Sequence, residues 1–366
     1  MKAVKIITIV CWLVVAAVLL GLAGWFLTGT VFGARSERWN NAMPFSFKLG
    51  GLEALTGPYN PVGVYNVGAT DLDSIRIDWI AGSITVRPYD GDQIKITEFA
   101  QRELRDEEKL SFDTSGDTLT VRFRERNRGN ILNMPQKKLE VLVPHRLSES
   151  LKKLAIDSTS GGVDVEGLSV VTLGVDSISG SVNIKNIISS VVKANSTSGS
   201  VTIADTRADD IEIDSISGSV RVSGSIAQKL DCETTSGRIN VSGEFGNAKL
   251  TTISGGISLD NSAQHSALRA DSTSGSLELW GSFDSVRVES LSGSISVRSA
   301  AVPSSLKAES TSGRITVAIP NEGAVSVYYS TTSGHFSSDI PVVVEGRGAQ
   351  FELSTLSGRI SIIELG

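Results

Sequence analysis

Apolar and polar residues alternate with a period of two through most of the chain after residue 71. In the stretch SIRIDWIAGSITVRP, the apolar residues Ile75, Ile77 and Trp79 are each separated by one polar residue, and the stretches KLSFDTSGDTLTVRFRE and KKLEVLVP show the same alternation. Successive side chains of a strand point to opposite faces of its sheet, so this pattern indicates strands with one buried face. The sequence therefore predicts an all-β protein.

From about residue 151 the chain becomes repetitive. A Ser-Gly pair recurs eleven times, first every 19 residues and later every 18 to 24, with its glycine at positions 161, 180, 199, 218, 237, 255, 275, 293, 313, 334 and 358. In most units the pair closes an S-x-S-G motif between two short alternating runs. Units at nearly fixed spacing are typical of solenoids. We predict a β-solenoid (β-helix) of S-x-S-G units over residues 151–366, after a smaller β module over residues 71–150.

The order of side chains within a unit predicts a corner at the motif. Ile211 and Ile213 share alternate positions with Ser215, and Val220 follows Gly218 as the start of a second run. Glycine permits a tight bend or a close approach of two backbones. Cys232 falls at the position of Ile213, so we expect a small buried residue there.

A second period appears in the residue between the two hydroxyl residues of the motif. It alternates between Thr and Ile or Leu up to position 311, then Thr332 breaks the series and Leu356 resumes it. This alternation favours a coil of about 38 residues that holds two units, giving six coils about 27 Å tall at the spacing of neighbouring strands. The alternative is a coil of one unit, with eleven coils about 53 Å tall, in which the alternation is left over from a duplication.

The N-terminus carries a long uncharged segment. Residues 6–27 are apolar over 22 positions, which is about 33 Å of helix and enough to cross a bilayer. A cleaved signal peptide would have a shorter apolar core and an A-x-A-like site, so we predict that residues 1–34 form an uncleaved signal anchor, a single transmembrane helix. The basic residues before and after it nearly balance, and the short leading tail favours an extracytoplasmic location for the rest. Residues 35–70, rich in Gly and Pro, are the expected tether.

Composition narrows the function further. The net charge of −6 argues against binding to nucleic acid. The two cysteines, Cys11 and Cys232, form neither a disulfide framework nor a metal motif. No G-x-S-x-G motif exists, and His335, which follows Ser333-Gly334, aligns with serines and arginines in other units. We therefore expect no catalytic residue, no metal ligand and no cofactor, and hence no enzyme.

Three columns of side chains are candidates for interaction, and each has a plainer interpretation. An acidic column stands four residues before the glycines and would either bind Ca²⁺ or form a solvated edge. The row Arg122, Arg124 and Arg126 would either meet phosphate-rich polymers or remain solvated. The apolar corner residues would be a binding stripe if they point outward and core if they point inward; they are Ile178, Ile216, Ile253, Leu291 and Leu356.

The stretches DWIAGSITV, SGDTLTV and LEVLVP and the serial S-x-S-G-x-[VI]-x-[VI] units, with the apolar N-terminus, resemble a bacterial putative-adhesin domain family of unknown function, some of whose members are LiaG-type membrane-anchored proteins. The likeness covers residues from about 71 to the C-terminus. It implies a solenoid of β-strand repeats and supplies no catalytic residues.

Together these patterns predict a non-catalytic, membrane-anchored protein of the cell envelope that acts as an adhesin-like surface module. The expected partners are the membrane, through the N-terminal helix, and a cell-wall polymer or other envelope proteins, with self-association as a further option. One alternative is an accessory component of an envelope-stress sensing system. A weaker one is an enzyme acting on envelope polysaccharide from a β-helix scaffold, for which no paired acids can be placed.

Overall fold

The computed structural model describes residues 58–124, 135–344 and 348–365, all within the unit Gly57–Gly366. The predicted anchor and residues 35–57 of the predicted tether lie outside the described residues. Within the part of the chain that is described, no helix is both long and apolar enough to span a membrane.

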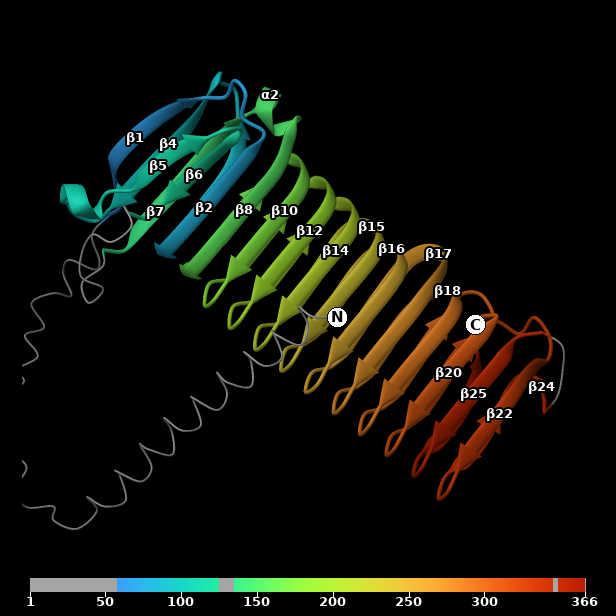
Figure 1. Cartoon of the computed structure of the whole chain (residues 1–366). Helices are drawn as coiled ribbons and strands as arrows, with labels where there is room; N and C mark the ends of the chain where they lie inside the picture. The colour runs from blue at the N-terminus through green and yellow to red at the C-terminus, as the bar shows by residue number, and fades with distance from the viewer. Residues whose placement is uncertain (1–57, 125–134, 345–347, 366) are drawn as a thin grey trace, which may run out of the picture. The chain divides into compact units, whose positions relative to one another are not determined.

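Two long rows of strands face each other and enclose the core (Figure 1). The first row is parallel except for the antiparallel pair β5–β6. In spatial order it contains β5 (Ser111–Ser115), β6 (Thr118–Arg122), β2 (Ser74–Ala81), β8 (Leu151–Ser160), β10 (Ser169–Ser177), β12 (Ile188–Ser196), β14 (Arg207–Ser215), the second halves of β15 (Val220–Thr234), β16 (Ile239–Thr252), β17 (Ile257–Ser272) and β18 (Leu277–Ser290), then β20 (Ser305–Ser310), β25 (Gln350–Thr355) and β22 (Val325–Thr331).

The second row begins with antiparallel pairs and continues as a parallel sheet. In spatial order it contains β1 (Asn60–Gly68), β4 (Gln93–Ala100), β7 (Lys137–Pro144), β3 (Ile84–Tyr89), β9 (Val163–Glu166), β11 (Val182–Lys185), β13 (Val201–Ala204), the first halves of β15 to β18, then β19 (Ile295–Ser299), β21 (Ile315–Ile319), β26 (Arg359–Glu364) and β23 (His335–Ser338). The short elements are η2 (Asp106–Glu108), α2 (His145–Ser148) and β24 (Val342–Val343).

Each coil of the solenoid holds one repeat unit, so the prediction of a two-unit coil is wrong. In the pairing of β10 with β12, Ser177 lies beside Ser196, 19 residues on, and Ser196 lies beside Ser215 in the next pair. The physical reason is that each unit already supplies one strand to each row and one corner to close the coil. Eleven stacked coils are about 50 Å tall at the usual strand spacing.

The last coils do not follow chain order. β25 lies between β20 and β22, pairing with both (Figure 1). In the second row, β26 lies between β21 and β23 and pairs with both. Leu356 is therefore placed between Thr311 and Thr332: its N–H bonds to the Ser310 carbonyl, and the Thr332 N–H bonds to the Leu356 carbonyl. The alternation of Thr with Ile or Leu, broken in the sequence, is continuous in space.

The N-terminal strands continue the solenoid and close its first end. β2 pairs with β8 and β3 pairs with β9, so the first coil of the repeat is built directly on this module. Residues 60–68, placed by the sequence in the tether, form β1 instead: the strand pairs antiparallel with β4, and Tyr65 and Val67, at alternate positions, pack against the core.

Inward-facing side chains fill the space between the two rows. Ile211 and Ile213 of β14, and Val220 and Val222 of β15, are buried at alternate positions, as the period-two pattern predicts. Cys232 stacks on Ile213 with no exposed surface, which confirms its prediction as a small buried residue, and burial raises the pKa of its thiol.

Candidate binding surfaces

The first hydroxyl of the motif is buried and closes the corner. Ser177 Oγ accepts a hydrogen bond from the Gly180 N–H at 3.0 Å, and Ser215 Oγ accepts one from Gly218 at 3.0 Å. A buried N–H without a partner costs about 1–3 kcal/mol. The hydroxyl at this position therefore serves as the hydrogen-bond acceptor of the glycine N–H, and it is not open to a ligand.

The glycines of the motif stack on one another without space for a side chain. A Cβ on Gly180 would lie 1.7 Å from the Gly161 carbonyl oxygen, and one on Gly218 would lie 1.9 Å from that of Gly199. The same contact places Gly358 against Gly313 at the far end. Glycine is thus required by the close approach of neighbouring coils, and any binding function of the corner must use the remaining positions.

The residue between the two hydroxyls points outward. We call the apolar members of this column the corner stripe: Ile178, Ile216, Ile253, Leu291 and Leu356, with 55%, 38%, 52%, 55% and 55% of their surface exposed. Threonines occupy the intervening coils, so successive stripe residues are about 10 Å apart. The alternation of residues in the sequence could not decide whether these side chains point inward or outward at the bend. In the structure they lie on the surface.

The acidic column lies on the outer face of the first row, in register from coil to coil. It contains Asp157, Asp176, Asn195, Asp214, Glu233, Asp271, Glu289 and Glu309. Basic residues of the neighbouring column pair with it, as in Arg269–Asp271 at 2.7 Å and Lys307–Glu309 at 2.9 Å. No group of three or more His, Cys, Asp or Glu in the described ranges is arranged to hold a metal ion. These contacts fit an exposed ladder of ion pairs.

Asp214 is the most perturbed carboxylate of this column. Desolvation, followed by repulsion from Glu233, Glu212 and Asp231, raises its pKa from 3.8 to about 6. The folded state therefore holds a proton that the unfolded state has released between about pH 4 and 6, so Asp214 reduces stability as pH rises through that window.

We expect Asp214→Asn to stabilise the protein at pH 7 and to have no effect below about pH 4. The gain should be under about 1 kcal/mol because the side chain is exposed and screened by water. Denaturant unfolding of both proteins between pH 3.5 and 7.5 measures this difference. Asn195 occupies the same column one coil earlier, so the amide fits; an equal difference at all pH values would contradict the assignment.

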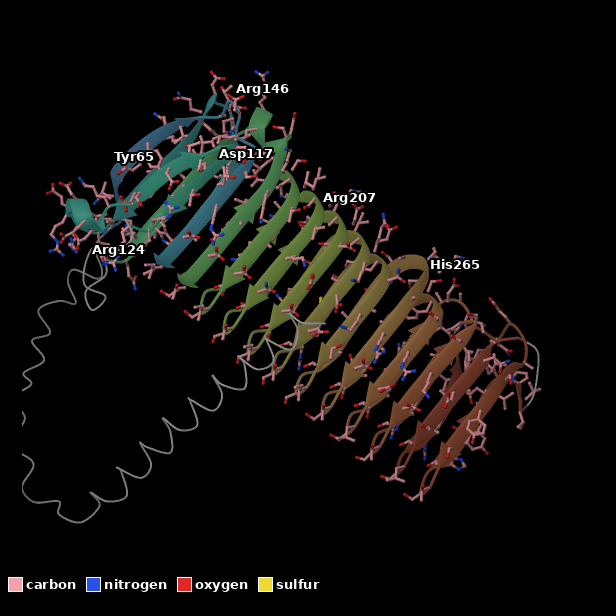
Figure 2. The ribbon with its side chains drawn as sticks, viewed as in Figure 1. Tyr65, Asp117, Arg124, Arg146, Arg207 and His265 are labelled. Carbon is pink, nitrogen blue, oxygen red and sulfur yellow. The ribbon has the colours of Figure 1, made fainter. Side chains whose placement is uncertain are left out.

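The arginine row divides into unlike parts. Arg122 ends β6 beside Asp78 and forms an ion pair with Asp113, so its charge is already compensated. Arg124 is half-buried in the N-terminal module (Figure 2), and Arg126 lies outside the described residues. The interaction of this row with anionic polymers stays a prediction.

The histidines lie on three separate elements. His145 is in α2 and His335 is exposed in β23. His265 is at the edge opposite the motif (Figure 2), 3.0 Å from Asp284. They do not converge on a common centre.

Sequence reasoning missed a buried ion pair in the N-terminal module. Lys137 and Glu98 are both fully buried, with Nζ 2.7 Å from Glu98 Oε1. The Lys137 ammonium also bonds the carbonyls of Glu108 and Phe123 and lies over the Phe123 ring, 3.9 Å from its centroid. Burial lowers the pKa of Lys137. The period-two alternation of β7 predicts that Lys137 is buried, because Lys137 lies two residues before the buried Leu139 and so faces the same side of the strand.

An exposed tryptophan was also missed. Trp280 of β18 points outward from the second row with half of its surface exposed, and the Arg298 guanidinium lies 5.7 Å from its ring centroid. The buried Leu277 and Leu279 in the same strand fix its outward direction by parity.

The fold and these surfaces define a two-row β-solenoid whose first end is closed by a smaller β module. The family described as Toastrack DUF4097 matches residues 72–284 and 244–360, and the chain belongs to this family. The resemblance to a putative-adhesin domain of unknown function is thereby confirmed. No curated protein matches the chain.

The solved structures that match the chain are distant in sequence. A putative adhesin from Parabacteroides distasonis is 12% identical with a TM-score of 0.38, and the match covers 85% of this chain and 98% of that one. A putative lipid binding protein from the same organism is 16% identical with a TM-score of 0.37, over 85% and 98%. A putative cell adhesion protein from Clostridium sporogenes is 10% identical with a TM-score of 0.21, over 84% and 100%.

Proposed function

We propose that the chain is a non-catalytic, membrane-anchored protein of the cell envelope whose solenoid is an adhesin-like binding module. The apolar segment 6–27 is the anchor, and the solenoid lies outside the cytoplasm. Membership of the Toastrack family supports a repeat-built surface module. The proposed ligand is a cell-wall polymer, which is long enough to lie along many coils.

The corner stripe is the observation that carries this proposal. Apolar side chains that stay exposed cost free energy in water, and exposed apolar residues that gather on one part of the surface, rather than being scattered singly, mark interaction sites. Here they recur on every second coil along one edge, separated by threonine hydroxyls. An edge with apolar and hydroxyl groups at fixed spacing suits a ligand that itself repeats, because each added repeat makes the same contacts again.

The stripe can be removed with substitutions that the corner already contains. Ile178→Thr/Ile216→Thr/Ile253→Thr/Leu291→Thr/Leu356→Thr gives every coil the threonine present on alternate coils, so the fold should be retained. We expect at least fivefold less of the full chain, held in detergent micelles, to cosediment with insoluble purified cell wall. The corresponding Thr197→Ser/Thr235→Ser/Thr273→Ser/Thr311→Ser/Thr332→Ser variant keeps the stripe and should bind as the unmodified chain does.

Three results of that experiment would count against the proposal. They are no cosedimentation of the unmodified chain, equal binding by the stripe variant, and equal loss in the threonine variant. If the stripe variant instead lost a membrane-protein partner while cell-wall binding was absent, the accessory role in envelope-stress sensing would replace the adhesin-like role.

A further inference from the structure

The second end of the solenoid is an unpaired edge. β22 and β23 form the last coil, which we call the terminal coil, and on its outer side β22 pairs only with β24, at Val325 and Ser326. The Ser326 N–H points inward to the Ala349 carbonyl at 3.0 Å. Because N–H directions alternate along a strand, those of Val327, Tyr329 and Thr331 face outward, where no described strand pairs with them.

Beyond its short pairing with β24, the terminal coil lacks the usual protection of an edge. Residues 324–338 contain no Asp, Glu, Lys, Arg or Pro, whereas edge strands are normally protected by charges, prolines or bulges. Tyr328 of the terminal coil lies beside Glu352 of the next coil inward, and 67% of the Tyr328 surface is exposed. Tyr329 stacks on Phe336, with ring centroids 4.1 Å apart, and is itself 48% exposed. The result is an edge without Asp, Glu, Lys or Arg side chains that exposes aromatic residues.

The first end of the same solenoid is protected. Its edge strand β1 contains Pro61 and a register shift between Pro61 and Gly63, and its other edge strand, β5, carries Asp113. Both devices prevent strand addition. The two ends are therefore not complementary, and head-to-tail stacking of molecules into a filament is not supported.

We propose that the terminal coil pairs with the terminal coil of a second copy of this chain, related by a two-fold axis. β22 of each copy would lie antiparallel to β22 of the other, so that the outward N–H and carbonyl groups between 327 and 331 find partners. A two-fold axis brings like residues close together, and the absence of charge removes the repulsion that any Lys or Glu on this coil would cause. Pairing consumes both free edges and closes the assembly as a dimer.

Chemical cross-linking of the full chain in detergent micelles tests this proposal. The background is Cys11→Ser, which leaves only the buried Cys232, with Ser330→Cys marking the terminal coil and Thr114→Cys on β5 marking the first end. With a short bismaleimide, Ser330→Cys should cross-link to itself in dilute protein, and Thr114→Cys should not. Adding Tyr328→Lys should reduce the Ser330→Cys product at least fivefold, whereas Glu352→Lys, in the same column one coil inward, should leave it unchanged.

Each alternative outcome overturns the proposal. Absence of the Ser330→Cys product would mean that the edge is free or is taken by another protein. Cross-linking between Ser330→Cys and Thr114→Cys in a mixture would indicate head-to-tail stacking, and equal loss with Tyr328→Lys and Glu352→Lys would indicate a surface other than the edge. The proposal does not rest on the corner stripe, so cell-wall binding by the stripe variants tests the proposed function separately.

Discussion

Gly218→Ala is expected to destabilise the solenoid by about 3–5 kcal/mol, at the upper end of single substitutions. The added methyl group would lie 1.9 Å from the Gly199 carbonyl oxygen and 3.0 Å from Ser215 Oγ. Both are held in place, the first by the neighbouring coil and the second by its bond to Gly218 itself. Relief would require two coils to separate, which would disturb pairing on both sides because each coil is stabilised by its neighbours.

Gly174→Ala is the matched control for this substitution. Gly174 lies in β10, no atom lies within 4 Å of the position that its added methyl group would take, and its partner on the preceding coil is already Ala155. Its stability should stay the same or rise by up to about 1 kcal/mol, since alanine restricts the unfolded chain. Denaturant unfolding followed by far-UV circular dichroism measures both variants. Similar midpoints for Gly218→Ala and the unmodified chain would show that the corner glycines do not set the coil contact.

The corner and the buried columns could be predicted because they depend on the order of residues within a single unit. Period-two parity alone places Ile213 and Cys232 on the inner face, and the small Ser-Gly pair marks the bend. Both conclusions need only the geometry of a strand and the steric freedom of glycine. The all-β fold with a solenoid of parallel coils followed from the same information.

The length of a coil could not be predicted in this way. The Thr and Ile alternation has a period of two units, and both a one-unit and a two-unit coil are compatible with it. What decides is the contact of Gly180 with Gly161, one unit away, which is a distance between coils and not a property of either unit. The insertion of β25 between β20 and β22 is hidden for a related reason, since parallel pairing does not require chain order.

The candidate surfaces could be predicted only in part from the sequence. The positions of the corner stripe were visible as a repeat, but whether Ile178 points outward depends on the bend at the corner. Parity could place Lys137 and Glu98 on buried faces of their strands, yet not in contact, because their pairing depends on β4 lying beside β7. Non-local pairing of strands is the step that residue patterns leave open.

The second large effect is expected from Lys137→Met, which should destabilise the N-terminal module by about 3–5 kcal/mol. Removing the ammonium leaves the Glu98 carboxylate buried, with the Leu110 N–H, at 3.0 Å, as its one remaining hydrogen-bond donor among the described residues, and an uncompensated buried charge has this cost. It also frees the Glu108 and Phe123 carbonyls, which Lys137 ties to β7. Denaturant unfolding monitored by tryptophan fluorescence suits this test, because the centroid of the Trp79 ring lies 5.1 Å from the Lys137 ammonium nitrogen.

Lys137→Met/Glu98→Leu separates the cost of the lone charge from the loss of packing. If burial of an unpaired carboxylate dominates, the double variant should recover more than half of the stability lost in Lys137→Met, because an apolar pair of similar volume replaces a desolvated ion pair at little net cost. If the carbonyl contacts dominate, the double variant should remain as unstable as the single one. Since β2 and β3 of the same module carry the first repeat coil, the first result would mean that the base on which the solenoid is built requires its buried carboxylate to be neutralised or removed, and does not require the ion pair itself.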